Sequence, residues 1–222
     1  MPNTSPLVVD VVSDIVCPWC YIGKRKLDVA LAQLARSEPS LGFSVRWHPF
    51  QLNPDLPPQG MPRASYVAQK WGDPARASQN YARVARAGEA VDIPFRFDLI
   101  RTQPNTQDGH RLIAWAQQRG DAAKLVERLF EAFFVEGRSI GDREELARLA
   151  ADSGCAEEEA RAMLASDAFQ AEVTSEGADA IDSGIQGVPF FIFNGRTAAS
   201  GAQEPAALLE AIAAARDAVT VN

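Results

Sequence analysis

The sequence has few of the residues that bind transition metals or build disulfide frameworks. Its 222 residues include only three cysteines and two histidines. Cys17 and Cys20 are separated by two residues, which is the spacing of one half of many zinc sites. The other candidate ligands, Cys155, His48 and His110, form no second close pair. A four-ligand zinc site is therefore disfavoured, and the sequence predicts no metal.

Long apolar runs and an excess of basic residues are also absent. No stretch approaches the roughly 18 apolar residues of a membrane span. The 29 acidic side chains outnumber the 22 basic ones and give a net charge of −7, which disfavours nucleic acid and membranes as partners. The N-terminal stretch MPNTSPLVVDVV has no basic segment, long apolar core or cleavage site. We therefore expect a cytoplasmic protein without a secretory signal.

Hydrophobic residues make up 46% of the chain, enough for one large domain or one domain with an insertion. Apolar, mostly β-branched residues over 7–12 predict a buried strand. Proline suits a first helical position, and helical spacing after Pro18 predicts a helix over 18–36. Alternation over 43–47 predicts a second strand. These elements form a β-α-β unit with Cys17 at the junction of strand and helix.

Prolines crowd residues 48–62, and helical periodicity then continues for more than a hundred residues. Thr106 and Asp121 are predicted helix caps, and Asp142 with Glu145 forms the aspartate version of a capping box. The expected helices cover 80–87, 106–120, 156–165 and 168–183, with two more that begin after Asp121 and at Asp142.

Strands return near the end of the chain, over 189–193 and 197–200. Asn194-Gly195 between them is a strong hairpin signal, and an alanine-rich helix is expected over 205–215. The order is β-α-β, then helices, then β-β-α. One sheet interrupted by a helical insertion explains this order better than two separate domains, so the predicted class is α/β.

The cysteine pair has a position that favours redox chemistry. Unpaired N–H groups and the positive end of a helix dipole stabilise a thiolate at Cys17. Cys20, one turn later, can close a disulfide or donate a hydrogen bond to that thiolate. Cys17 is thus the predicted nucleophile and Cys20 the thiol that resolves a mixed disulfide. Pro18 makes the turn rigid, and Trp19 adds apolar surface beside the sulfur. An inert buried pair stays open, because the preceding strand could bury both sulfurs.

Pro189, which opens a strand, is a second feature of interest. A proline there often marks a cis bond or a sheet edge. A cis proline beside the cysteines would leave the backbone of Val188 free to bind an extended substrate. An ordinary trans proline at a sheet edge is the alternative.

Asp14 and His110 are further candidates with simpler interpretations. Asp14, three residues before Cys17, could accept a proton during exchange, but we favour a backbone cap. His110 could face the cysteines and bind substrate, but a solvated histidine or one at the core edge is the favoured interpretation. Four aromatic residues fit two interpretations equally well, an apolar substrate groove and ordinary core packing. They are Trp71, Tyr81, Phe95 and Phe97.

Five motifs resemble the DsbA-like thioredoxin-fold oxidoreductases of the FrnE type, in the order of that family and over nearly the whole chain. They are Asp14-x-x-Cys17-Pro18-Trp19-Cys20-Tyr21-Ile22-Gly23, Trp47-x-Pro49-Phe50-Gln51-Leu52-Asn53-Pro54, Pro104-Asn105-Thr106 with His110-Arg111-Leu112, Gly187-Val188-Pro189-Phe190-Phe191, and Ser200-Gly201-Ala202-Gln203.

The resemblance implies a thioredoxin fold with a large all-helical insertion. The expected division is a discontinuous thioredoxin-like domain, residues 1–58 and 186–222, and a helical insertion domain, residues 59–185. The resemblance also implies that Cys17 and Cys20 are the redox pair and that Pro189 is cis and packs against them. The expected activity is disulfide exchange with protein or peptide thiols and disulfides, without a cofactor.

Two related families qualify this expectation. The 2-hydroxychromene-2-carboxylate isomerases and kappa-class glutathione transferases share the fold but carry serine at the position of Cys17. In those relatives, glutathione is held at positions that correspond to Val188, Ala202 and Gln203. Both cysteines are present here, which favours dithiol exchange. A glutathione-dependent transferase or isomerase, a non-catalytic binding module or chaperone, glutathione as a co-substrate, and a homodimer all stay open.

Overall fold

The structure is a computed structural model that describes residues 6–120 and 122–217. These residues form a four-stranded sheet of order β2-β1-β5-β6, in which β1 is parallel to β2 and antiparallel to β5, and β5 is antiparallel to β6. The strands are β1 (Leu7–Ser13), β2 (Phe43–Pro49), β5 (Phe190–Phe193) and β6 (Thr197–Ser200). The predicted order of one interrupted sheet is confirmed. A second, two-stranded sheet pairs β3 (Met61–Pro62) with β4 (Thr102–Gln103).

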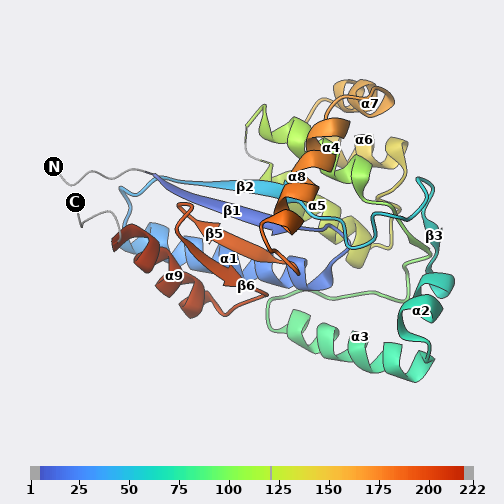
Figure 1. Ribbon diagram of the computed structural model, residues 1–222, viewed down its shortest axis with the longest axis horizontal. Coiled ribbons are helices and arrows are strands. Elements are labelled where there is room, and N and C mark those ends of the chain that lie inside the picture. The colour runs from blue at the N-terminus through green and yellow to red at the C-terminus, as the bar shows by residue number, and fades with distance from the viewer. Residues whose placement is uncertain (1–5, 121, 218–222) are drawn as a thin grey trace.

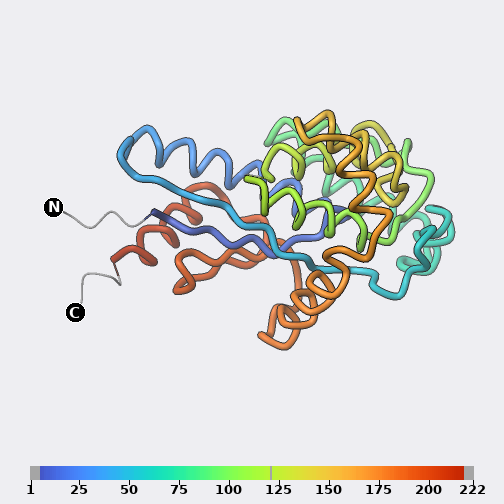
Figure 2. Tube along the Cα trace, turned by 90° about the horizontal axis from the view of Figure 1, so that it is seen from above, coloured from blue at the N-terminus to red at the C-terminus, as the bar shows by residue number. Residues whose placement is uncertain are grey.

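Helices α1 and α9 contact each other alongside the sheet, and α2 to α7 gather towards the carboxyl ends of β1 and β2 (Figures 1 and 2). None of the described helices is long and apolar enough to cross a bilayer. Their bounds are α1 (Pro18–Ser37), α2 (Arg63–Trp71), α3 (Pro74–Glu89), α4 (Gln107–Gln117), α5 (Ala123–Phe134), α6 (Arg143–Asp152), α7 (Glu157–Ala165), α8 (Gln170–Asp182) and α9 (Pro205–Asp217).

Strand β1 is buried on both faces, as its apolar sequence predicts. Val11 pairs with Trp47 of β2 and with Phe191 of β5, and it is 1% exposed. The one charged residue of the strand, Asp10, accepts two hydrogen bonds from the Arg46 guanidinium, at 2.6 and 2.9 Å. A buried carboxylate requires such a partner, so the strand tolerates its single charge.

Two predicted helix caps differ in outcome. The Asp142 carboxylate accepts the Glu145 N–H at 2.8 Å, so this half of the predicted capping box is confirmed. Thr106 occupies the N-cap position of α4 but makes no capping hydrogen bond with its side chain. The Asn105 side chain instead accepts the Gln107 N–H at 2.9 Å. The prediction of a Thr106 side-chain cap is therefore wrong, because the side chain of Asn105 makes the capping hydrogen bond instead.

Several helix boundaries also differ from the prediction. Helix α2 was not predicted, and α3 begins at Pro74, where Asp73 accepts the Ala75 N–H, rather than at residue 80. Helix α8 begins at Gln170, because Phe169 before it has a left-handed backbone, with φ of 63°. The predicted cap Asp121 lies outside the described residues.

One continuous cluster of buried hydrophobic residues joins the sheet to the helical segment. It includes Val9 and Phe191 of the sheet as well as Leu129 of α5 and Leu146 of α6. The helices therefore share a core with the sheet. The division into residues 1–58 with 186–222 and residues 59–185 stays a prediction.

Gly23, in the second turn of α1, brings that helix close to the end of β5. An added Cβ atom would lie 2.8 Å from Cγ of Pro189 and 3.2 Å from the Phe191 ring. Gly177 of α8 is a helical glycine with space around it, since its Cβ would meet only the Pro49 carbonyl oxygen, at 3.9 Å. The two glycines thus make a matched pair.

We predict opposite effects of alanine at these two positions on the free energy of unfolding. Gly23→Ala should lower it by about 1–3 kcal/mol, the usual cost of overpacking a core. Gly177→Ala should raise it by about 0.5–1 kcal/mol, because alanine favours a helix interior. Denaturant titration of both variants is the measurement. An equal gain of stability in both would contradict the contact between α1 and Pro189.

Candidate active site

The turn between β1 and α1 positions the two cysteines. Cys17 is the N-cap of α1, with extended backbone (φ −93°, ψ 112°), and Pro18 takes a first helical position. The Cys17 N–H donates to the Asp14 carbonyl at 2.9 Å, and the Cys17 carbonyl accepts the Cys20 N–H at 3.0 Å. The side chain of Cys17 makes no capping hydrogen bond. Its sulfur therefore lies at the helix N-terminus, where backbone N–H groups have no intrahelical partner.

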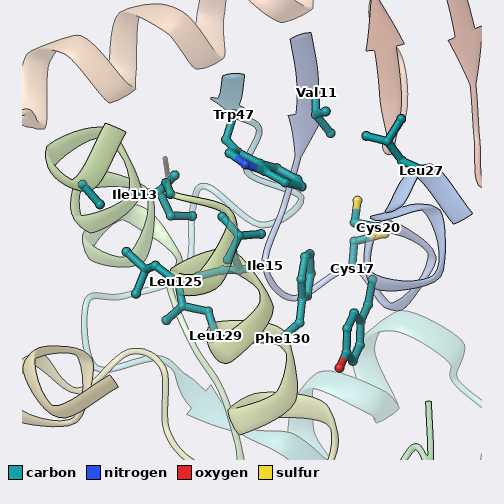
Figure 3. Close-up of a cluster of buried hydrophobic side chains, with 14 of the residues drawn as sticks. Val11, Ile15, Cys17, Cys20, Leu27, Trp47, Ile113, Leu125, Leu129 and Phe130 are labelled. Carbon is teal, nitrogen blue, oxygen red and sulfur yellow. The ribbon is translucent and has the colours of Figure 1, made fainter. Parts of the chain in front are cut away.

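Cys17 and Cys20 are both free thiols, near each other and not bonded. They lie next to each other at one end of the buried cluster that contains Val11, Ile15 and Phe130 (Figure 3). Cys17 is 5% exposed and Cys20 2% exposed. Both cysteines are thus buried, as expected for an inert pair. Their reactivity therefore depends on which thiol is ionised and on whether a substrate can reach it.

The two thiols have unlike proton affinities. The hydrogen bond from the Cys20 thiol lowers the pKa of Cys17, with help from the backbone N–H groups of Cys20 and Trp19, while burial and the charge of Asp14 oppose this shift. Burial raises the pKa of Cys20 well above its usual value, and its bond to Cys17 adds to the effect. The pair therefore favours a thiolate at Cys17 and a protonated thiol at Cys20.

Cys17 lines a cavity of about 290 Å³, so this nearly buried residue borders an open space large enough for a small molecule. The walls come from distant parts of the chain, with Trp19 from α1, Trp71 from α2, Tyr81 from α3 and Val188 from the loop before β5. The possible groove residues Trp71 and Tyr81 do line this space. The other two aromatic residues considered with them, Phe95 and Phe97, stack on each other and meet Phe134 edge to face.

Val188 and Pro189, which directly precede β5, lie close to the cysteine turn. The peptide bond between them is cis. The Cys17 thiol is 3.7 Å from the Val188 carbonyl oxygen, within reach of a weak hydrogen bond that it would donate when protonated. The Pro189 ring lies against the position of Gly23, one turn after Cys20. The segment thus lies against Cys17 and against the turn of α1 that follows Cys20.

Asp14 is fully buried and holds backbone in place. One carboxylate oxygen accepts the Leu52 N–H at 2.8 Å, and the other is 3.5 Å from the Val16 N–H. This agrees with the favoured interpretation of Asp14 as a cap. The second oxygen is also 3.3 Å from Nε2 of His110.

His110 is 4% exposed, so of the two forms of the favoured interpretation the solvated histidine is excluded and the histidine at the core edge remains. The fold turns α4 so that His110 faces the buried carboxylate of Asp14, which offers it a hydrogen-bond partner. Its side chain lines a different cavity, of about 210 Å³, between β2 and helices α4 and α8. The structure therefore does not bring His110 to the cavity beside Cys17.

Ala202 and Gln203 lie between β6 and α9. The Ala202 carbonyl accepts a hydrogen bond from Lys26 at 3.2 Å, and the Gln203 side chain donates to the Ser200 carbonyl at 2.6 Å. Neither residue lines the cavity beside Cys17. Their role as glutathione contacts stays a prediction.

Three basic residues in this cavity escaped the sequence analysis. Arg63 and Lys70 of α2 and Arg83 of α3 line it. No local pattern in the sequence connects them with Cys17, because they are more than 40 residues away along the chain. As for metals, the part of the chain that the structure describes contains no group of His, Cys, Asp and Glu side chains able to hold an ion.

The comparisons with known proteins agree with this geometry. A probable DsbA oxidoreductase from Streptomyces coelicolor has a solved structure similar to this one, with a TM-score of 0.84 and 30% identity over 95% of this chain and 90% of that one. The uncharacterized protein YwbO of Bacillus subtilis is 27% identical over 146 residues, 66% of this chain and 66% of that protein. The cytosolic disulfide reductase DsbM from Pseudomonas aeruginosa, solved with GSH, shares the fold at 18% identity, with a TM-score of 0.59 over 96% of this chain and 97% of that one.

The family comparison covers nearly the whole chain. The DSBA-like thioredoxin domain matches residues 8–213. The expected α/β thioredoxin fold is confirmed. The chain belongs to the DSBA-like thioredoxin domain family, a family of thioredoxin-fold oxidoreductases.

Proposed function

We propose that this protein is a thiol-disulfide oxidoreductase that exchanges disulfides through Cys17 and Cys20. The unlike proton affinities of the two thiols carry the proposal. A low pKa at Cys17 and a raised pKa at Cys20 give one sulfur the charge needed for attack and leave the other protonated. The cavity beside Cys17 gives a substrate access to the first sulfur.

The reaction has two steps with balanced atoms and electrons. The Cys17 thiolate attacks one sulfur of a substrate disulfide, forms a mixed disulfide and releases the other half as a thiolate. Cys20 then gives its proton to the first released thiolate and attacks the Cys17 sulfur, which releases the second half as a thiolate that takes a proton from water. The substrate is reduced to two thiols and the cysteine pair is oxidised to a disulfide. In the reverse direction, the oxidised pair transfers its disulfide to a dithiol.

The partners proposed for this reaction are protein or peptide thiols and disulfides. Val188, which borders the Cys17 sulfur, offers backbone to an extended substrate. Glutathione is a candidate reductant, because the similar disulfide reductase of Pseudomonas aeruginosa is described with GSH. A cytoplasmic location and a homodimer stay predictions from the sequence.

A trapping experiment tests the roles of the two cysteines. Reduced Cys20→Ser protein should form a stable mixed disulfide with a disulfide-bonded peptide such as insulin, because no second thiol resolves it, and mass spectrometry should locate the adduct on Cys17. Cys17→Ser should form none and should reduce insulin no faster than the buffer thiol alone. Cys155→Ser is the matched control and should behave as the unchanged protein.

Two results would count against the proposal. Full insulin reduction by Cys17→Ser would exclude Cys17 as the nucleophile. Full turnover by Cys20→Ser would show that Cys20 is not needed to resolve the mixed disulfide.

The origin of the Cys17 pKa gives a second prediction. The hydrogen bond from Cys20 is the largest cause of the lowered pKa. Cys20→Ala removes the donor and should raise the pKa of Cys17, whereas Cys20→Ser keeps an O–H donor and should raise it less. Thiolate absorbance near 240 nm, followed against pH in both variants, is the measurement. Identical titrations would show that the helix N-terminus, and not Cys20, sets the pKa.

A further inference from the structure

The cavity beside Cys17 has a charge opposite to that of the whole protein. The chain has 29 acidic and 22 basic residues, yet three basic side chains line this cavity, Arg63, Lys70 and Arg83. No Asp or Glu is among the described residues that line it. The positive charge is therefore concentrated where a substrate would meet Cys17.

None of these three cations is neutralised by a described carboxylate. Arg63 donates to the Gln103 side-chain oxygen and to the Tyr81 hydroxyl, the latter at 2.8 Å. Lys70 donates to the Tyr66 hydroxyl at 2.8 Å. Burial lowers the pKa of Arg63, because it disfavours the charged form of the side chain. The hydrogen-bond partners of Arg63 are neutral, so an anion in the cavity would offset this desolvation cost.

Aromatic rings hold the three cations in position. The Arg83 guanidinium lies 5.6 Å from the ring centre of Trp19, Lys70 Nζ lies 5.7 Å from that of Trp71, and Arg63 lies 5.5 Å from that of Tyr81. These are cation–π distances. Each cation thus lies beside an aromatic ring, and the rings also offer flat apolar surface to a ligand.

Trp71 also lines this cavity. Its ring is therefore part of the surface that a bound molecule would meet.

We propose that this cavity selects small disulfides that carry an acidic group and a flat or apolar body, in preference to neutral and cationic ones. Arg63, Lys70 and Arg83 are the specificity-determining residues. This inference rests on the proposed disulfide exchange at Cys17. A volume of about 290 Å³ suits a small molecule or the end of a peptide, and arginine forks bind carboxylates with two parallel hydrogen bonds.

The chemistry is the exchange described above, in the direction that reduces the substrate disulfide. The Cys17 thiolate attacks the disulfide, one half of the molecule leaves as a thiolate, and the acidic group of the attached half stays near the three cations. Cys20 then releases that half as a second thiolate. The substrate disulfide is itself the oxidant, so a single turnover of the reduced protein needs no other reagent.

Single-turnover rates with three aliphatic disulfides of similar size test the proposal. They are 3,3′-dithiodipropionate, bis(2-hydroxyethyl) disulfide and cystamine, which are anionic, neutral and cationic. Each rate is divided by the rate of the same disulfide with 2-mercaptoethanol, which removes intrinsic differences in reactivity. A flat aromatic pair, 5,5′-dithiobis(2-nitrobenzoate) and neutral 4,4′-dithiodipyridine, is treated in the same way.

We expect the normalised rates to favour the anionic over the cationic disulfide by about tenfold or more at low salt, and the preference to shrink as salt screens the charges. Within the aromatic pair, the carboxylate should again be preferred. Arg83→Gln should move the ratio of anionic to neutral rates towards one. Arg86→Gln is the matched control, because Arg86 is exposed on the same helix and does not line the cavity, and it should keep the ratio of the unchanged protein.

The two possible failures are distinguishable. Equal normalised rates for all three aliphatic disulfides would overturn the selectivity and leave the exchange reaction standing. Rates no faster than those of 2-mercaptoethanol for every disulfide would instead contradict the proposed function. Should Arg83→Gln lose its fold in a thermal scan, Lys70→Gln replaces it, and an unchanged ratio in that variant would equally overturn the inference.

Discussion

The position of two buried thiols one helical turn apart gives them unlike proton affinities. Cys20 is almost completely buried, so its ionised form is strongly disfavoured and it keeps its proton. That proton is then available to the Cys17 sulfur, whose negative charge it stabilises together with backbone N–H groups of the first turn of α1. Two chemically identical side chains thereby acquire different proton affinities, and the difference comes from position alone.

The rest of the fold holds this turn in place and encloses it. The Asp14 carboxylate accepts hydrogen bonds from the backbone N–H groups of Val16, just before the turn, and of Leu52, after β2. On the opposite side, the absence of a side chain at Gly23 lets Pro189 approach α1. Helices α2 and α3 then supply the outer wall of the cavity. The end of the sheet therefore holds the sulfur in place, and α2 and α3 border the space beside it.

The local features of the site could be predicted from the sequence. Of its long-range features, only the cis Pro189 beside the cysteine turn was expected, and that expectation came from the family resemblance. The position of Cys17 at a strand-to-helix junction follows from an apolar run and a proline, which are neighbours in the chain. The burial of His110 depends on how α4 meets Asp14, nearly a hundred residues earlier, and periodicity contains no information on that contact. For the same reason Arg63, Lys70 and Arg83 gave no signal. Helix α2 was missed because it is short and follows a proline-rich segment that predicts irregular structure.

The central claim is that the Cys17 sulfur loses its proton more readily than an ordinary thiol and is accessible. Site-resolved alkylation with iodoacetamide, followed by mass spectrometry over a range of pH, measures both properties at once. Cys155 provides a comparison within the same chain, because burial raises its pKa and it lies outside the cysteine turn. The account predicts that Cys17 is labelled faster than Cys155, with a rate that rises and levels off at a lower pH. Labelling of Cys17 at the same rate as Cys155, or slower, would contradict it.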